Sequence, residues 1–140
     1  MKTTHTTNYY NTFIAVAEDC PATMGEVPQL KAGTKSIANL EFELMSRHPY
    51  AFTSDDILFQ VFAERNQLDQ AGFTEARAVL FSKGQACLRS SALGKRYGWG
   101  IHFNEEGKVA LFGREQPEYQ QLARDTNLKQ LKAMRSKRSK

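Results

Sequence analysis

The segment between residues 87 and 102 gathers side chains that are suited to binding an anion. Seven of them are candidate ligand-binding residues: Arg89, Ser90, Lys95, Arg96, Tyr97, Trp99 and His102. Arginine binds a carboxylate or phosphate through a planar fork of donors, and lysine adds a point charge. Glycines at positions 94, 98 and 100 would let backbone N–H groups approach such a ligand closely. The segment therefore predicts a binding site for a small molecule, which includes an anionic one as a possible ligand.

The same residues also fit a purely structural interpretation, which the sequence leaves open. Trp99 would then face the core, the glycines would allow close packing or a bulge, and Lys95 and Arg96 would be solvated. His102 would titrate near physiological pH, but no serine or cysteine partner can be assigned to it from sequence. The question of whether the protein is an enzyme is left open.

Motifs for metal binding and nucleophilic catalysis are missing from the sequence. It contains no phosphate-loop pattern, no GxSxG elbow and no SxxK lysine. Cys20 and Cys87 have neither CxxC spacing nor a neighbouring histidine cluster, so we expect no metal site, no disulfide framework and no cofactor. Cys87 is predicted to be a small buried hydrophobic residue in a strand between Ala86 and Leu88.

The net charge of +4 comes from one end of the chain. Residues 129–140 hold six Lys and Arg and no acidic residue, whereas residues 1–128 hold 13 basic and 15 acidic residues. We expect 1–128 to be a single domain and 129–140 a basic tail that is disordered or a fraying helix. A nucleic-acid accessory protein that binds through this tail is one alternative function, although the acidic balance of the domain weakens it.

No stretch of the sequence reaches the 18 apolar residues that a transmembrane helix needs, and the N-terminus lacks a secretory pattern. We therefore expect a soluble, cytoplasmic protein with no membrane partner. The sequence does not indicate the oligomeric state. A protein-interaction or oligomeric module is the third functional hypothesis, for which an exposed aromatic patch that includes Tyr50 and Phe52 would be the sign.

The elements that would position these residues predict an α+β fold. Residues 9–17 are rich in aromatic and β-branched types and predict a strand, and alternation across 96–112 predicts a hairpin that turns at Asn104–Gly107. Together they predict a small antiparallel sheet with three to four helices packed on one face. The expected helices span residues 36–47, a segment from residue 53, residues 74–84 and residues 117–126.

Two adjacent carboxylates, Asp55 and Asp56, invite a catalytic interpretation that the local pattern disfavours. Thr53 and Asp56 have the spacing of a capping box at the start of a helix. Early carboxylates also stabilise the positive end of a helix, and adjacent helical residues do not face one another. We therefore predict helix capping for both residues.

Three long strings carry a resemblance to a known family: HTTNYYNTFI near the start, TSDDILFQVFAERN in the middle and KRYGWGIHFNEEGKVAL toward the end. Over nearly its whole length the chain resembles a family of proteins of about 140 residues described as a domain of unknown function. The resemblance implies no reaction, cofactor, partner or catalytic residue. The functional hypotheses therefore depend on the residues alone.

Overall fold

The computed structural model describes residues 4–30 and 32–136 and has an α+β fold. The predicted fold class is therefore confirmed. In chain order the elements are β1 (Thr12–Ala15), α1 (Ile37–Arg47), α2 (Ser54–Arg65), η1 (Gln70–Gly72), α3 (Phe73–Leu80), η2 (Leu88–Ser90), α4 (Ala92–Lys95), β2 (Trp99–Phe103), β3 (Val109–Gly113), α5 (Pro117–Arg124) and β4 (Lys129–Lys132).

The four strands form one sheet in the order β3-β2-β1-β4. The β2–β3 hairpin is present as predicted, and Gly107 in its turn has a φ of +80°, which glycine adopts without strain. β1 pairs antiparallel with β2, but it pairs in parallel with β4. The sheet is therefore mixed, and the expectation of a purely antiparallel sheet is wrong.

Residues 129–136 belong to the folded structure, contrary to the expectation of a disordered or fraying tail. Lys129–Lys132 are β4, the Ala133 N–H donates to the carbonyl of Ala15 (2.8 Å), and Ala133 is buried. Lys132 and Arg135 both form ion pairs with Glu18. The fold thus partly balances two of the six basic charges, while residues 137–140 of the expected tail lie outside the described residues.

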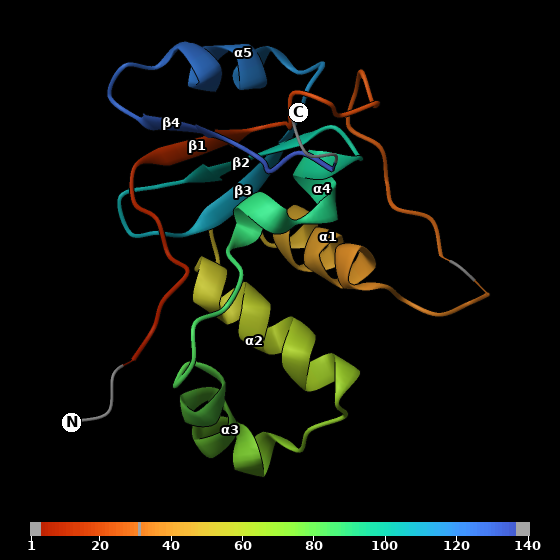
Figure 1. Ribbon diagram of the computed structural model, residues 1–140, viewed down its shortest axis with the longest axis vertical. Coiled ribbons are helices and arrows are strands. Elements are labelled where there is room, and N and C mark those ends of the chain that lie inside the picture. The colour runs from red at the N-terminus through yellow and green to blue at the C-terminus, as the bar shows by residue number, and fades with distance from the viewer. Residues whose placement is uncertain (1–3, 31, 137–140) are drawn as a thin grey trace.

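Helices cover both faces of the sheet, not one face as expected. One face carries Ile14, Ile101 and Phe103, which pack against α1, α2 and α4 in the main core. The other face carries Phe13 and Val16, which pack against Tyr119 of α5. Figure 1 shows α5 on one side of the sheet, with α1, α2 and α4 on the other and α3 farthest from it.

The helix boundaries follow local capping signals. α1 begins with a capping box between Ser36 and Asn39, and α2 begins with the predicted box between Thr53 and Asp56. α3 ends at Leu80 rather than at Gly84. The carbonyl groups of its last turn accept hydrogen bonds from Ser82 Oγ and Gln85 Nε2. In the described part of the chain, no helix is both long enough and apolar enough to span a bilayer.

Candidate functional site

A cavity of about 450 Å³ lies between α1, α2, the end of α3 and the segment 85–92. Its volume falls within the range of small-molecule sites, which are usually concave and mostly apolar with a few placed polar groups. Apolar side chains make up much of its wall: Ile37, Leu58, Val61, Phe62, Leu80 and Leu88. The polar side chains in the wall include Glu41, Gln85, Ser90 and Ser91.

Glu41 is a carboxyl group buried at this cavity, with 6% of its surface exposed. Burial raises its pKa to about 7, and a hydrogen bond from Ser91 opposes the rise. Ser91 Oγ donates to Glu41 Oε1 at 2.7 Å and itself accepts from the Leu93 N–H at 3.1 Å. The single hydroxyl proton of Ser91 is therefore committed to Oε1.

The second oxygen of Glu41, Oε2, belongs to a side chain that lines the cavity. It has no hydrogen-bond partner among the described residues. Every side-chain nitrogen or oxygen of the described residues that is fully removed from solvent has a partner, so Oε2 keeps some accessible surface. Oε2 is thus an accessible acceptor on a residue of the cavity wall.

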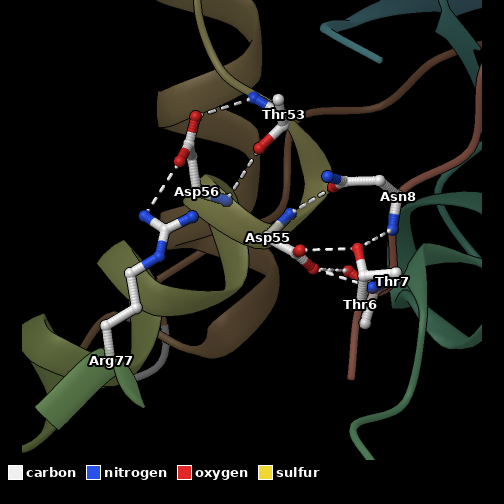
Figure 2. Close-up of polar contacts among 7 residues, drawn as sticks. All are labelled: Thr6, Thr7, Asn8, Thr53, Asp55, Asp56 and Arg77. Atoms are coloured by element: carbon white, nitrogen blue, oxygen red, sulfur yellow. Dashed lines mark hydrogen bonds and ion pairs between the residues drawn. The ribbon is translucent and has the colours of Figure 1, made fainter. Parts of the chain in front are cut away.

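The N-terminal segment, residues 4–9, bonds the first turn of α2, as Figure 2 shows for Thr6, Thr7 and Asn8. Thr6 Oγ1, Thr7 N and Thr7 Oγ1 donate to the carboxylate of Asp55 over 2.6–2.7 Å, and Asn8 Oδ1 accepts from the Asp55 N–H. Farther along the segment, Tyr9 Oη lies 3.5 Å from Cys87 Sγ in the cavity wall.

Asp56 links the start of α2 to α3. Its carboxylate accepts from the Thr53 N–H at 3.0 Å and pairs with Arg77 at 2.9 Å, as Figure 2 shows. Burial would raise the pKa of Asp56, but the bonds from Thr53 and Arg77 together hold it below its ordinary value. The Arg77 guanidinium also lies 5.8 Å from the ring centres of Phe59 and Phe81. The predicted capping role of Asp56 is confirmed, whereas the carboxylate of Asp55 bonds Thr6 and Thr7 of the N-terminal segment and no N–H group of its own helix.

Replacing Thr7 with Val is expected to lower the free energy of unfolding by about 1–2 kcal/mol. The hydroxyl of Thr7 bonds both Asp55 Oδ1 and the buried Ser54 Oγ, and valine keeps the shape while removing both bonds. Urea unfolding measures the loss, and faster proteolysis of residues 4–11 would accompany it. Thr4→Val, at an exposed position, is the matched control. Equal stability of the two variants would contradict the assigned role of Thr7.

Ser90 and the three basic candidates lie in different surroundings in the structure. Ser90 lines the cavity, and its Oγ donates to the carbonyl of Cys87 at 2.8 Å. Arg89 turns toward β4, where its Nε donates to the carbonyl of Lys132 at 2.8 Å. Lys95 is the last residue of α4 and Arg96, its C-cap, is exposed. Of these four residues, Ser90 alone lines the cavity.

The aromatic candidates lie on both sides of the sheet. Trp99 packs against Phe42, and its Nε1 donates to the carbonyl of Glu26 at 2.8 Å. Tyr97 is half-buried against the main core. His102 lies on the opposite face, where its Nδ1 is 2.7 Å from the hydroxyl of Tyr50 and burial lowers its pKa. A single small ligand therefore cannot contact all seven candidates, because the sheet separates Trp99 from His102.

The three glycines of this segment allow other parts of the protein to pack closely against the backbone, and they do not leave room for a ligand. A Cβ at position 94 would lie 2.8 Å from that of Ala133, and one at position 100 would lie 2.5 Å from Phe13 Cζ. At position 98 it would overlap the carbonyl oxygen of Met24. The space that a ligand would need is therefore occupied by the protein itself.

Glu41 and Cys87 are the points at which the sequence prediction and the site differ most. Glu41 was not among the candidates, although it lies three residues after Ala38 and four before Met45, on the buried face of α1. An acidic residue on an apolar helix face was the available signal. Cys87 is not in a strand but at the N-cap of η2, half-exposed in the cavity wall.

The aromatic residues proposed for a protein interface are both half-buried. The Tyr50 hydroxyl bonds His102, and the ring of Phe52 packs edge-on against His48. Within residues 4–30 and 32–136, no group of three or more His, Cys, Asp or Glu side chains is placed to hold a metal ion. These observations direct attention to the cavity at Glu41.

The fold and the cavity define an α+β domain with a buried carboxyl group at a mainly apolar cavity. The chain belongs to a family of unknown function, DUF6157, whose model matches residues 4–139. No curated protein and no solved structure matches the chain.

Proposed function

We propose that this protein binds a small, largely apolar molecule in the cavity between α1 and α2, with Glu41 as the polar anchor. The observation that carries the proposal is the unpartnered Oε2 of Glu41, which belongs to a side chain that lines the cavity and has 6% of its surface exposed. A buried carboxyl group costs stability unless a partner satisfies it. A ligand that bonds Oε2 would supply that partner.

The surroundings of Glu41 support a binding role over a purely structural one. In Asp55, a carboxylate with a structural role, both oxygens are bonded by Thr6 and Thr7, as Figure 2 shows. In Glu41 the bond from Ser91 satisfies one oxygen and leaves the other without a partner among the described residues. Perturbed carboxyl groups in clefts are more frequent at functional sites than elsewhere.

Filling the cavity is expected to abolish ligand binding. In Ala86→Trp the new indole starts from an exposed position in the cavity wall, so it occupies the space without disturbing the core. The measurement is a fragment screen monitored by amide chemical shifts. We expect hits to perturb residues of α1 and the segment 85–92, and to lose at least about tenfold in affinity in the variant.

Ala78→Trp is the matched control for this experiment, because Ala78 is exposed on α3 and does not line the cavity. Ala92→Trp, from α4, fills the cavity from a second direction. A ligand at a hundred times its dissociation constant adds about 2.7 kcal/mol of stability, which thermal unfolding detects. Hits that bind both filled variants as tightly as the unmodified protein would refute the proposed site.

A further inference from the structure

Hydrogen bonding within the protein leaves the polar side chains of the cavity with free acceptors. The hydroxyl proton of Ser91 is committed to Glu41 Oε1, and that of Ser90 is committed to the carbonyl of Cys87. A hydroxyl group whose proton is used still has lone pairs to offer. Ser90 Oγ and Glu41 Oε2 therefore present acceptors to a molecule that enters.

The two amide side chains in the cavity wall follow the same pattern. Gln85 Nε2 donates to the carbonyl of Leu80 at 2.9 Å, and Asn66 Nδ2 donates to the carbonyl of Phe62 at 2.8 Å. Within the described chain, Gln85 Oε1 and Asn66 Oδ1 have no partner. Three polar side chains of the wall, Ser90, Gln85 and Asn66, thus have a donor engaged and an acceptor oxygen free, and Glu41 adds its free Oε2.

The charged and titratable groups around Glu41 are few. Among the described residues that line the cavity, they are Arg65 on α2, Cys87 before η2 and Glu41 itself on α1. Arg65 is exposed in the last turn of α2, where water and salt screen its charge. Glu41 is buried, where a charge interacts more strongly with a bound ion.

We propose that the ligand carries a positively charged, N–H-rich group, such as an ammonium, amidinium or guanidinium, on an apolar body. This inference rests on the proposed function and assigns its ligand class. The cationic group donates to Glu41 Oε2 and the free acceptor oxygens, and the apolar body packs along Leu58, Val61 and Leu88. The predicted preference is therefore opposite in sign to that of the anion site expected from sequence.

A cationic ligand suits this site better than a neutral acceptor does. Burial penalises the ionised form of Glu41, and a bound cation offsets that penalty while forming a charge-assisted hydrogen bond. A neutral carbonyl could accept from protonated Oε2 but would leave the other acceptor oxygens unsatisfied. A carboxylate would oppose the charge of Glu41.

Three probes with the same aromatic body test the ligand class: 2-phenylethylammonium, 2-phenylethanol and 3-phenylpropionate. We expect the ammonium probe to bind about tenfold more tightly than the alcohol at pH 8, and the carboxylate to bind weakest. The preference should shrink at pH 5.5, where Glu41 is protonated while the amine keeps its charge. Glu41→Gln should remove the preference and retain the affinity for the alcohol.

Proton release provides a readout that a merely structural carboxyl group would not give. At pH 6 Glu41 is mainly protonated, and a bound cation favours its ionised form. Binding of the ammonium probe should then release about one proton, whereas binding of the alcohol should release none. Isothermal titration in buffers of different ionisation enthalpy measures this number. Absence of proton release on ammonium binding would contradict contact with Glu41.

Arg65→Gln is the control for nonspecific charge effects, and it should change the affinity of the ammonium probe by no more than about twofold. Equal or tighter binding of the alcohol or carboxylate would overturn the ligand class and leave the cavity as a binding site. The ligand class would also be overturned if fragments from the preceding screen bind the cavity and the ammonium probe does not. If neither the fragments nor the probes bind the cavity, the proposed function fails as well.

Discussion

Replacing Glu41 with Gln is expected to stabilise the protein by about 3 kcal/mol more at pH 8 than at pH 4, as measured by the free energy of unfolding. Glutamine keeps the shape of the side chain and can accept from Ser91 through its Oε1, but it has no charge to bury. The gain should therefore appear only where the wild-type side chain is ionised. This is the largest pH-dependent effect that we expect from a single carboxyl group of this chain.

The sign of this effect follows from the raised pKa. Between its ordinary value of 4.5 and about 7, Glu41 is protonated in the folded chain and ionised in the unfolded chain. The folded state binds more protons in this window, so the stability of the wild-type protein falls as pH rises through it. The contribution of Glu41 is fully present below 4.5 and lost above about 7.

Urea unfolding at pH 4, 6 and 8 measures the effect, as the difference between wild type and Glu41→Gln at each pH. Glu64→Gln, at an exposed position of α2, is the matched control and should show no such trend. A constant difference across the three pH values would show that Glu41 is not buried as described. Greater stability together with lost binding of the ammonium probe would identify Glu41 as a residue that trades stability for function.

Replacing Gly98 with Ala is expected to cost at least about 3 kcal/mol of folding stability. Gly98 has a φ of +80°, which strains any residue with a side chain. The added Cβ would also overlap the carbonyl oxygen of Met24, a backbone atom that cannot rotate away as a side-chain end would. Both effects act against the contact between β2 and the loop that includes Met24.

Circular dichroism during urea unfolding measures the loss in Gly98→Ala. Gly72→Ala is the matched control, because a Cβ there meets nothing within 4 Å and should change the stability by less than about 1 kcal/mol. A variant that fails to fold agrees with the expectation, whereas one as stable as Gly72→Ala would contradict it. In that case the segment around Met24 would have to lie away from β2.

Elements governed by local signals could be predicted from the sequence. The capping box at Thr53 and Asp56, the alternation in β2 and the glycine of the hairpin turn are each contained within a few residues. β4 could not be predicted in this way, since KQLK is charged and lacks the β-branched residues of typical strands. Its pairing with β1 depends on contacts between distant parts of the chain, which override local preference.

The candidate site was predictable only in part, for a related reason. A ligand-binding site near residues 87–102 was expected, and the cavity wall does include Cys87 and Ser90. Its central residue, Glu41, comes from another helix, so its burial depends on how α1 packs against α2 and η2. His102 could have been set apart from Trp99, because residues three apart on a strand point to opposite faces.

The late position of β4 in the sequence leaves β1 exposed while the chain is being synthesised. The residues that cover the outer edge of β1 are translated long after it, since Arg135 lies 117 positions after its partner Glu18 in the sequence. During translation β1 has an uncovered edge, and open strand edges pair readily with other chains. Contacts between such distant segments also slow folding. A chain terminated before Lys129 is therefore expected to aggregate, and the growing chain to depend on chaperones until β4 has been made.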